Sequence, residues 1–278
     1  MLRDLIVHLE GNKEDKVRLA YAELLAVRHD AFITGLFSNI VPDNVYSAGY
    51  GSMLAAQSAS QMQETAMKNG DKAEKKLKKM LDKLSAKTEL RRLDVSFSIA
   101  PQKVSAETRT SDLMIATRPY NHHSAAPELL EAVLFNSGRA VFFAPPAIMP
   151  NGEIDHCVVA WRNTRESSRA VSQAMPILTK AKKVTIALIA EEGSKEFEKA
   201  MPGADIARHL DRHGVNVQIR QITEWSNPAE ALLNEMARID GKLLVMGGYG
   251  HSRFRELVLG GVTRDVLKNS EFPVLMSH

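Results

Sequence analysis

The amino-acid sequence predicts an α/β fold made of two tandem domains, each with a five-stranded parallel, doubly wound sheet and helices on both faces. Three observations lead to this expectation. The chain has 278 residues, a length that fits about two domains. Short apolar runs alternate with segments of helical periodicity, which is typical of parallel sheets. The second half of the chain also repeats the pattern of the first.

The repeat is visible at two corresponding places in each half. Residues 5–20 and 157–172 each hold an apolar run, a polar turn and the start of a helix. Further along, residues 133–137 (VLFNS) correspond to residues 266–270 (VLKNS). Two matches in the same order indicate tandem copies of one α/β unit.

A proline- and glycine-rich segment, PPAIMPNG at residues 145–152, separates the two copies. Proline and glycine interrupt helices, so this segment is expected to be a linker. We therefore expect one domain at residues 1–148 and the other at residues 151–278.

The sequence pattern of the second copy predicts that strands and helices alternate from its first apolar run onward. The expected strands are at 157–161, 184–190, 215–222, 242–246 and 272–276, and the expected helices are at 165–181, 196–213, 228–239 and 263–269. Thr164 is the expected N-cap of the first of these helices, and Pro228 stands at the favoured first position of the third. Five strands in this alternation predict one parallel sheet.

The first copy differs by a long helical stretch that we expect over residues 52–92. Its apolar stripe of Leu77, Met80, Leu81 and Leu84 predicts a solvated helix packed on the body of the domain. The lysine-rich segment KAEKKLKKMLDKL is also compatible with a surface patch that binds nucleic acid or an acidic partner. Acidic residues are interleaved and no stacking aromatic accompanies the lysines, so nucleic acid is not expected.

Composition sets the broad class of the protein. The chain is 44% apolar with a net charge of +3, and its apolar runs are far shorter than a membrane span. The N-terminus turns charged after a few apolar residues, unlike a signal peptide. The single cysteine, Cys157, fits a reducing compartment. We expect a cytoplasmic protein that does not bind membranes.

The sequence shows no motif that is typical of a metal site or of a catalytic nucleophile. His122 and His123 with Glu128, or His156 and Cys157 with Asp155, lack the spacing of known metal sites, so no metal site is expected. No G-x-S-x-G elbow is present, so no catalytic residue is predicted.

The segment at residues 242–278 holds the most informative motif. The apolar run opens into Gly247-Gly248-Tyr249-Gly250, a second glycine pair follows at Gly260-Gly261, and a helix and a strand come after it. In this layout backbone N–H groups and a helix N-terminus can surround a phosphate. No lysine follows the glycines and no G-x-G-x-x-G opens the helix, so neither the P-loop nor the dinucleotide fingerprint applies.

The glycine spacing, G-x2-G-x9-G-G, resembles the nucleotide-binding signature of the universal stress protein family, G-x2-G-x9-G-[ST]. The words LLVMG, ELVLGGVTRDVLKNS and FPVLM around it are similar to that family as well. The resemblance is strong over residues 155–278 and weaker over residues 1–148. One departure is Gly261, which stands at the hydroxyl position, with Thr263 two residues further on.

The resemblance implies ATP or AMP as the ligand, with adenosine against the ends of the first two strands and phosphates in the glycine loop. The residues that it implies for nucleotide binding are Ala160, Arg162, Ile189, Met246, Gly247, Tyr249, Gly250, Gly260, Gly261, Val262 and Thr263. A second departure is Arg162, because the family usually has an aspartate there. Arginine cannot accept a hydrogen bond from adenine.

The first copy has lost this loop. Residues 117–120 (TRPY) stand where the second copy has Gly247 to Gly250, and Pro127 takes the place of the third glycine. The residue that matches Arg162 is Glu10. We therefore expect the first domain to be a scaffold that does not bind phosphate.

The implied function is a stress response through nucleotide-dependent binding or signalling. The loop supplies neither a base nor an acidic pair for magnesium, so efficient hydrolysis is not expected and a need for magnesium stays open. The alternatives are a tandem scaffold that binds partners without nucleotide, and slow ATP hydrolysis. The resemblance also implies pairing of the two domains through residues 141–143 and 274–276, and allows a homodimer and an unidentified protein partner.

Overall fold

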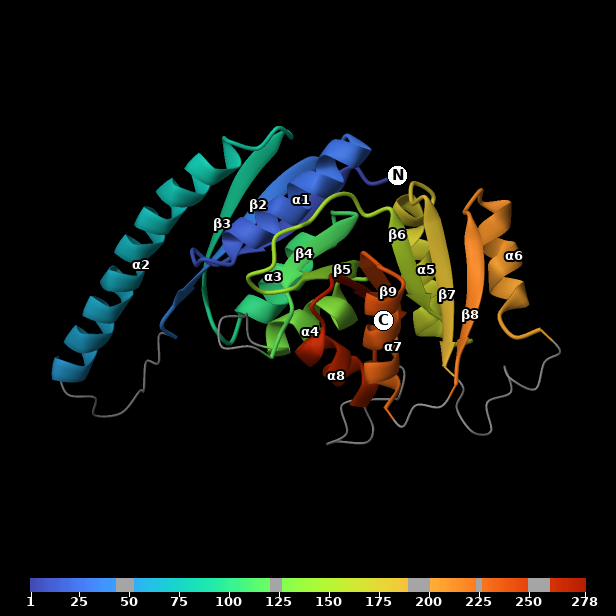
Figure 1. Cartoon of the computed structure of the whole chain (residues 1–278). Coiled ribbons are helices and arrows are strands. Elements are labelled where there is room, and N and C mark those ends of the chain that lie inside the picture. The colour runs from blue at the N-terminus through green and yellow to red at the C-terminus, as the bar shows by residue number, and fades with distance from the viewer. Residues whose placement is uncertain (44–52, 121–126, 190–200, 224–226, 250–260) are drawn as a thin grey trace.

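Ten strands of the chain join in one continuous sheet (Figure 1). The computed structural model describes residues 1–43, 53–120, 127–189, 201–223, 227–249 and 261–278. Within these residues the strand order is β3-β2-β1-β4-β5-β10-β9-β6-β7-β8. Each half contributes five parallel strands, so the predicted α/β fold of two similar halves is confirmed.

The first half holds the helices and strands numbered up to β5. They are β1 (Asp4–Leu9), α1 (Asp15–His29), β2 (Phe32–Val41), α2 (Met53–Leu81), β3 (Thr88–Ser96), α3 (Ala100–Thr108), β4 (Leu113–Thr117), α4 (Pro127–Asn136) and β5 (Ala140–Ala144). The segment between β5 and β6 contains the predicted linker and has neither helix nor strand.

The second half repeats this order of strands and helices. It holds β6 (His156–Ala160), α5 (Arg165–Leu178), β7 (Lys183–Ile189), α6 (Ala204–Arg212), β8 (Val217–Ile222), α7 (Pro228–Arg238), β9 (Leu243–Gly247), α8 (Gly261–Asn269) and β10 (Val274–Ser277). Thr164 is the N-cap of α5, as predicted, because its side chain accepts a hydrogen bond from the Ser167 N–H.

The two halves meet at the middle of the sheet, where β5 and β10 pair antiparallel. The register joins Val274 to Phe143 and Met276 to Val141, which confirms the predicted pairing through residues 141–143 and 274–276. An antiparallel pair of equivalent strands relates the halves by an approximate twofold axis. The carboxyl ends of the strands in one half therefore have counterparts in the other half, on the opposite side of this axis.

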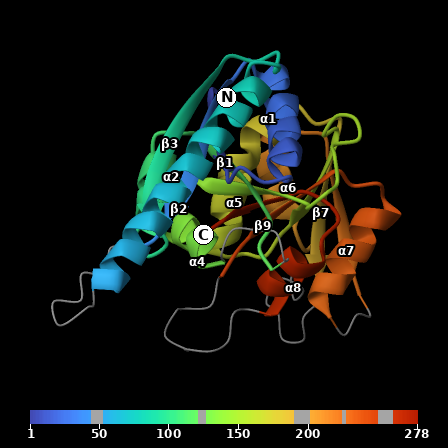
Figure 2. The same ribbon diagram turned by 90° about the vertical axis from the view of Figure 1, so that its left-hand side faces the viewer.

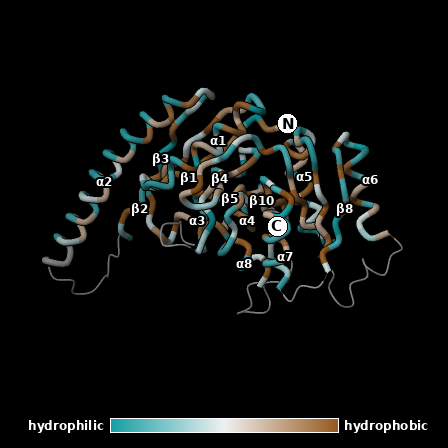
Figure 3. The backbone as a smooth tube through the Cα atoms, viewed as in Figure 1, coloured by the Kyte–Doolittle hydropathy of each residue, from teal (hydrophilic) through white to brown (hydrophobic). Residues whose placement is uncertain are grey.

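Helices cover both faces of the sheet in a matching arrangement. One apolar cluster packs α1, α2, α5 and α6 against the sheet, and a second cluster packs α3, α4, α7 and α8 against the other face. Figure 3 shows the apolar positions concentrated in the central strands. In the described part of the chain, every helix is too short or too polar to cross a membrane.

The long helix α2 lies along the β3 end of the sheet (Figure 2). Its predicted stripe is confirmed: Leu77 and Leu81 are buried, and Met80 and Leu84 pack against the same cluster. The prediction that the helix continues to residue 92 is wrong, because α2 ends at Leu81 and residues 88–96 form β3.

β3 escaped prediction because it is a highly charged strand at the sheet edge. It pairs with β2 along its whole length, from Ile33 with Thr88 to Val41 with Ser96. Arg92 on this strand forms ion pairs with Asp71 and Glu74 of α2, at 2.6 and 3.0 Å. An edge strand with one side against solvent can carry such charges, so it lacks the apolar pattern that predicts a strand.

Candidate functional site

The predicted strand-end residues of the second half lie at one edge of the sheet. Ala160, at the end of β6, pairs with Met246 of β9 and with Ala187 of β7, and Ile189 ends β7 two residues later. The chain leaves β6 toward β7 and later returns on the other side as β9. In parallel sheets the crevice between two such strand ends is the usual place for a ligand.

Gly247 is needed at the end of β9 for close packing. A Cβ atom added there would lie 2.6 Å from the carbonyl carbon of Glu166 and 2.6 Å from the Ser167 nitrogen. Both atoms belong to the first turn of α5, which passes directly over the strand end. Because Gly247 has no side chain, the N-terminus of α5 can approach this edge of the sheet.

Two backbone amides of the glycine loop bind to the protein itself. The Gly248 N–H donates to the Ser277 carbonyl at 2.9 Å, and the Tyr249 N–H donates to Thr263 Oγ1 at 3.3 Å. The Gly248 bond continues the sheet, since the Arg118 N–H makes the equivalent bond to Ala144 in the first half. Neither amide is available to a phosphate in this arrangement.

The helix α8 starts at Gly261, so the amides of residues 261–263 lie in its first turn. Such amides have no carbonyl partner within their own helix and attract anions. A Cβ atom added at Gly261 would meet no atom of the described residues within 4 Å. Thr263 is buried and its hydroxyl holds the loop, whereas Gly250 and Gly260 lie outside the described residues.

Arg162 is exposed just beyond the end of β6. Its carbonyl accepts a hydrogen bond from the Thr164 N–H at 2.7 Å, in the turn that leads into α5. Its neighbour Trp161 is partly buried and packs against the core. The other tryptophan, Trp225, lies outside the described residues.

Tyr249 joins the glycine loop to the first half, a contact that no sequence pattern predicts. Its hydroxyl lies 3.3 Å from Oε1 of Glu131 on α4, and its ring lies 5.3 Å from the ring of Phe135. Tyr120, in the first-half loop, places its own hydroxyl 3.4 Å from the same carboxylate oxygen. Burial raises the pKa of Tyr249, so the phenol stays protonated and donates to Glu131.

The first-half loop is likewise engaged with the second half. Arg118 Nη1 donates to the Leu267 carbonyl at 2.7 Å, and the same nitrogen contacts the Lys268 carbonyl. These carbonyls end α8, where a cation is favourable. Arg118 thus acts as a cap for a helix of the other half.

No group of three or more His, Cys, Asp or Glu side chains suited to a metal ion occurs among the described residues. Cys157 is fully buried, and burial raises the pKa of its thiol to about 12. At neutral pH this thiol is therefore neither a ready metal ligand nor a nucleophile.

Comparison with known proteins assigns the second half to a family. Residues 153–278 match the model of the universal stress protein family. The C-terminal half of the chain belongs to the universal stress protein family. A curated universal stress protein of Synechocystis is 36% identical over 66 residues, a stretch that spans 24% of this chain and 22% of that relative.

Solved structures extend the fold likeness to the whole chain. A universal stress protein from Archaeoglobus fulgidus DSM 4304 has a TM-score of 0.71 at 17% identity, over 99% of this chain and 95% of that one. A protein described as a putative universal stress protein, from Pseudomonas aeruginosa UCBPP-PA14, has a TM-score of 0.60 at 15% identity, over 99% and 93%. The first half therefore shares the universal stress protein fold.

Proposed function

We propose that the second half binds an adenine nucleotide, ATP or AMP, and that the protein acts in a stress response by nucleotide-dependent binding or signalling. The supporting observation is the Thr263 hydroxyl on the Tyr249 amide. This bond holds the first turn of α8 beside the end of β9, next to the edge where Ala160 and Met246 pair. A helix N-terminus at a sheet crevice is suited to a phosphate group.

The proposed division of the site follows the positions of the residues. Adenosine lies against Ala160 and Ile189 at the strand ends, and the phosphates lie against the first turn of α8, at Gly261, Val262 and Thr263. Gly247 lets the α5 turn approach the same edge. Because the Gly248 and Tyr249 amides are occupied, the α8 turn supplies the phosphate donors among the described residues.

Calorimetry with ATP tests this proposal through Gly261, where the described part of the chain leaves room for a larger side chain. Gly261→Ser adds the hydroxyl of the family signature, and one added hydrogen bond should tighten ATP binding about three- to tenfold. Gly261→Ala adds the same carbon without the hydroxyl and should bind like the unmodified protein. Titration with and without magnesium shows whether the metal contributes.

The absence of saturable heat at millimolar ATP in all three proteins would contradict nucleotide binding. The tandem scaffold without nucleotide is the second candidate, and the occupied amides of Gly248 and Tyr249 favour it. A freshly purified protein whose native mass shows no bound nucleotide, together with that calorimetric result, would establish the scaffold.

A further inference from the structure

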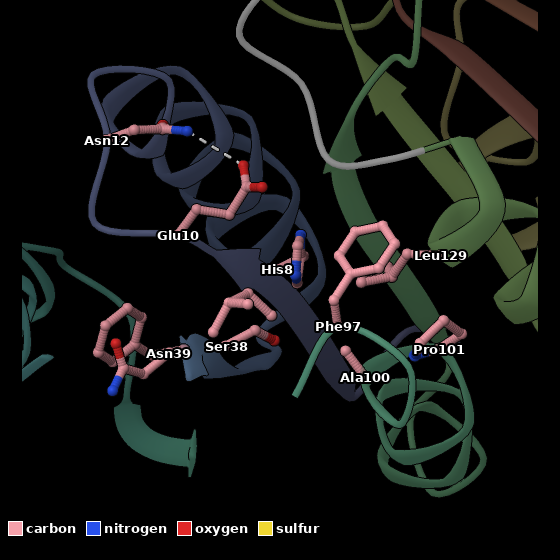
Figure 4. A pocket seen from close by; sticks show the side chains of 11 residues that line it. His8, Glu10, Asn12, Ser38, Asn39, Phe97, Ala100, Pro101 and Leu129 are labelled. Carbon is pink, nitrogen blue, oxygen red and sulfur yellow. Dashed lines mark hydrogen bonds between the residues drawn. The ribbon is translucent and has the colours of Figure 1, made fainter. Parts of the chain in front are cut away.

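A cavity of about 420 Å³ lies at the strand ends of the first half, the half without a glycine loop. Its wall includes His8 and Glu10 from the end of β1, Ser38 and Asn39 from β2, Phe97 after β3, and Leu129 of α4. Figure 4 shows the His8 side chain at the centre, with Ser38 on one side and Phe97 and Leu129 on the other. Cavities of this size hold small molecules.

The cavity is the counterpart of the adenosine position proposed for the second half. Ile6 of β1 pairs with Met114 of β4 just as Val158 of β6 pairs with Leu244 of β9. Two residues further on, His8 therefore takes the place of Ala160. By the same reasoning along β2 and β7, Ser38 takes the place of Ile189. Two apolar positions in one half are polar in the other.

These two polar side chains are buried without a hydrogen-bond partner. His8 is 1% exposed and Ser38 is 5% exposed, and both imidazole nitrogens and the Ser38 hydroxyl are unpartnered. Other polar groups in the wall are satisfied: Asn12 donates to Glu10 at 3.1 Å, and Asn39 donates to Asp94 at 2.6 Å. Unpartnered buried polar groups destabilise a fold, so their presence at a cavity points to a ligand that binds them.

The charges around the cavity disfavour a phosphate. None of the described residues in its wall is a lysine or an arginine, and Glu10 is a carboxylate. Arg18 lies behind Glu10 at 2.7 Å, but it is also paired with Asp15, so two carboxylates already balance one guanidinium. Burial lowers the pKa of His8, which keeps its imidazole neutral, with one donor and one acceptor nitrogen.

We propose that the first half binds an uncharged small molecule without phosphate, whose donor and acceptor groups meet His8 and Ser38 and whose apolar part lies against Phe97 and Leu129. This site is separate from the nucleotide site proposed for the second half. The first half is then a second sensor with its own ligand chemistry, rather than a scaffold alone.

NMR of the histidine ring signals in the full chain tests the proposal, because only nine histidines are present. His8→Leu identifies the His8 signals by their loss. Adenosine and uridine serve as uncharged probes, and AMP serves as the phosphorylated match of adenosine. At least one uncharged probe should shift the His8 signals saturably, and AMP should need at least about ten times the concentration of adenosine, since a phosphate has no cationic partner there.

Variants separate this site from the rest of the molecule. Ser38→Ala removes the proposed hydrogen bond between the Ser38 hydroxyl and the bound probe. The probe concentration needed to shift the His8 signals should therefore rise about three- to tenfold. His209→Leu, at an exposed position on α6, is the control and should leave that response unchanged. The proposal is overturned if no uncharged probe shifts the His8 signals at millimolar concentration, or if AMP shifts them as readily as adenosine. The response of the His8 signals does not depend on whether the second half binds ATP, so the two proposals can fail separately.

Discussion

At the residue scale, glycines of one sequence signature serve different physical purposes. Gly247 is required by packing, because the first turn of α5 leaves no room for a Cβ atom. At Gly261 no atom of the described residues imposes that constraint. The spacing of the glycines could not separate these roles, since each depends on which segment of the fold packs against the position.

Gly247→Ala should therefore lower the stability of the fold, whereas Gly261→Ala should not. The added methyl group at residue 247 meets main-chain atoms of α5, which cannot rotate away, so a loss of about 1–3 kcal/mol is expected. At residue 261 the change should stay within about 0.5 kcal/mol. Urea denaturation measures both, and equal stability of the two variants would show that the α5 contact is looser than the structure has it.

His29 makes stability depend on pH. It is 3% exposed at the end of α1, both of its ring nitrogens are unpartnered, and burial, with Lys180 and Arg28 nearby, lowers its pKa to about 4. In the unfolded chain a histidine takes up a proton near pH 6.5. The unfolded state therefore binds more protons between about pH 6.5 and 4, and folding stability falls as the pH drops through that window.

Comparison of urea denaturation at pH 7 and pH 5 measures this contribution. The unmodified protein should lose on the order of 2 kcal/mol more than His29→Leu, which has no proton to bind. His213→Leu, at an exposed position, controls for the loss of a histidine and should behave like the unmodified protein. If His29→Leu shows the same loss as the unmodified protein, His29 is not the responsible group.

At the element scale, the sequence pattern predicted the strands whose apolar residues are buried. It did not predict the strand whose residues are only partly buried. The expected strand at 157–161 is β6 at His156–Ala160, and the expected helix at 228–239 is α7 at Pro228–Arg238. β3 was absorbed into a predicted helix because its charged residues sit at an edge and pair with α2. The cavity at His8 was also missed, since its wall combines residues of β1, β2 and α4 that only the fold brings together.

The helix α2 should tolerate change at one end and not at the other. Leu77 is fully buried against the sheet, whereas Met62 is 61% exposed. Leu77→Ala should therefore lower the free energy of unfolding by about 2–5 kcal/mol, as expected for a large-to-small change in a core. Met62→Ala should change it by less than about 0.5 kcal/mol. Similar losses in both variants would contradict this difference between the two ends of α2.

At the scale of the whole molecule, the ten-stranded sheet makes the halves one structural unit. β5 and β10 share backbone hydrogen bonds, Arg118 caps α8, and Tyr120 and Tyr249 converge on Glu131. The strand pairing, the Arg118 contact and the contact of Tyr249 with Glu131 each join residues of the first half to residues of the second half. The loop that follows β4 and the loop that follows β9 are therefore each held in part by the other half.

The two halves should consequently unfold together. Both tryptophans, Trp161 and Trp225, belong to the second half, so their fluorescence reports on that half alone. Leu77→Ala removes packing in the first half, and its denaturation midpoint by tryptophan fluorescence should fall as far as the midpoint by circular dichroism, which reports on both halves. A fluorescence midpoint equal to that of the unmodified protein, beside a lowered first transition in circular dichroism, would mean that the β5–β10 pairing is too weak to couple the halves.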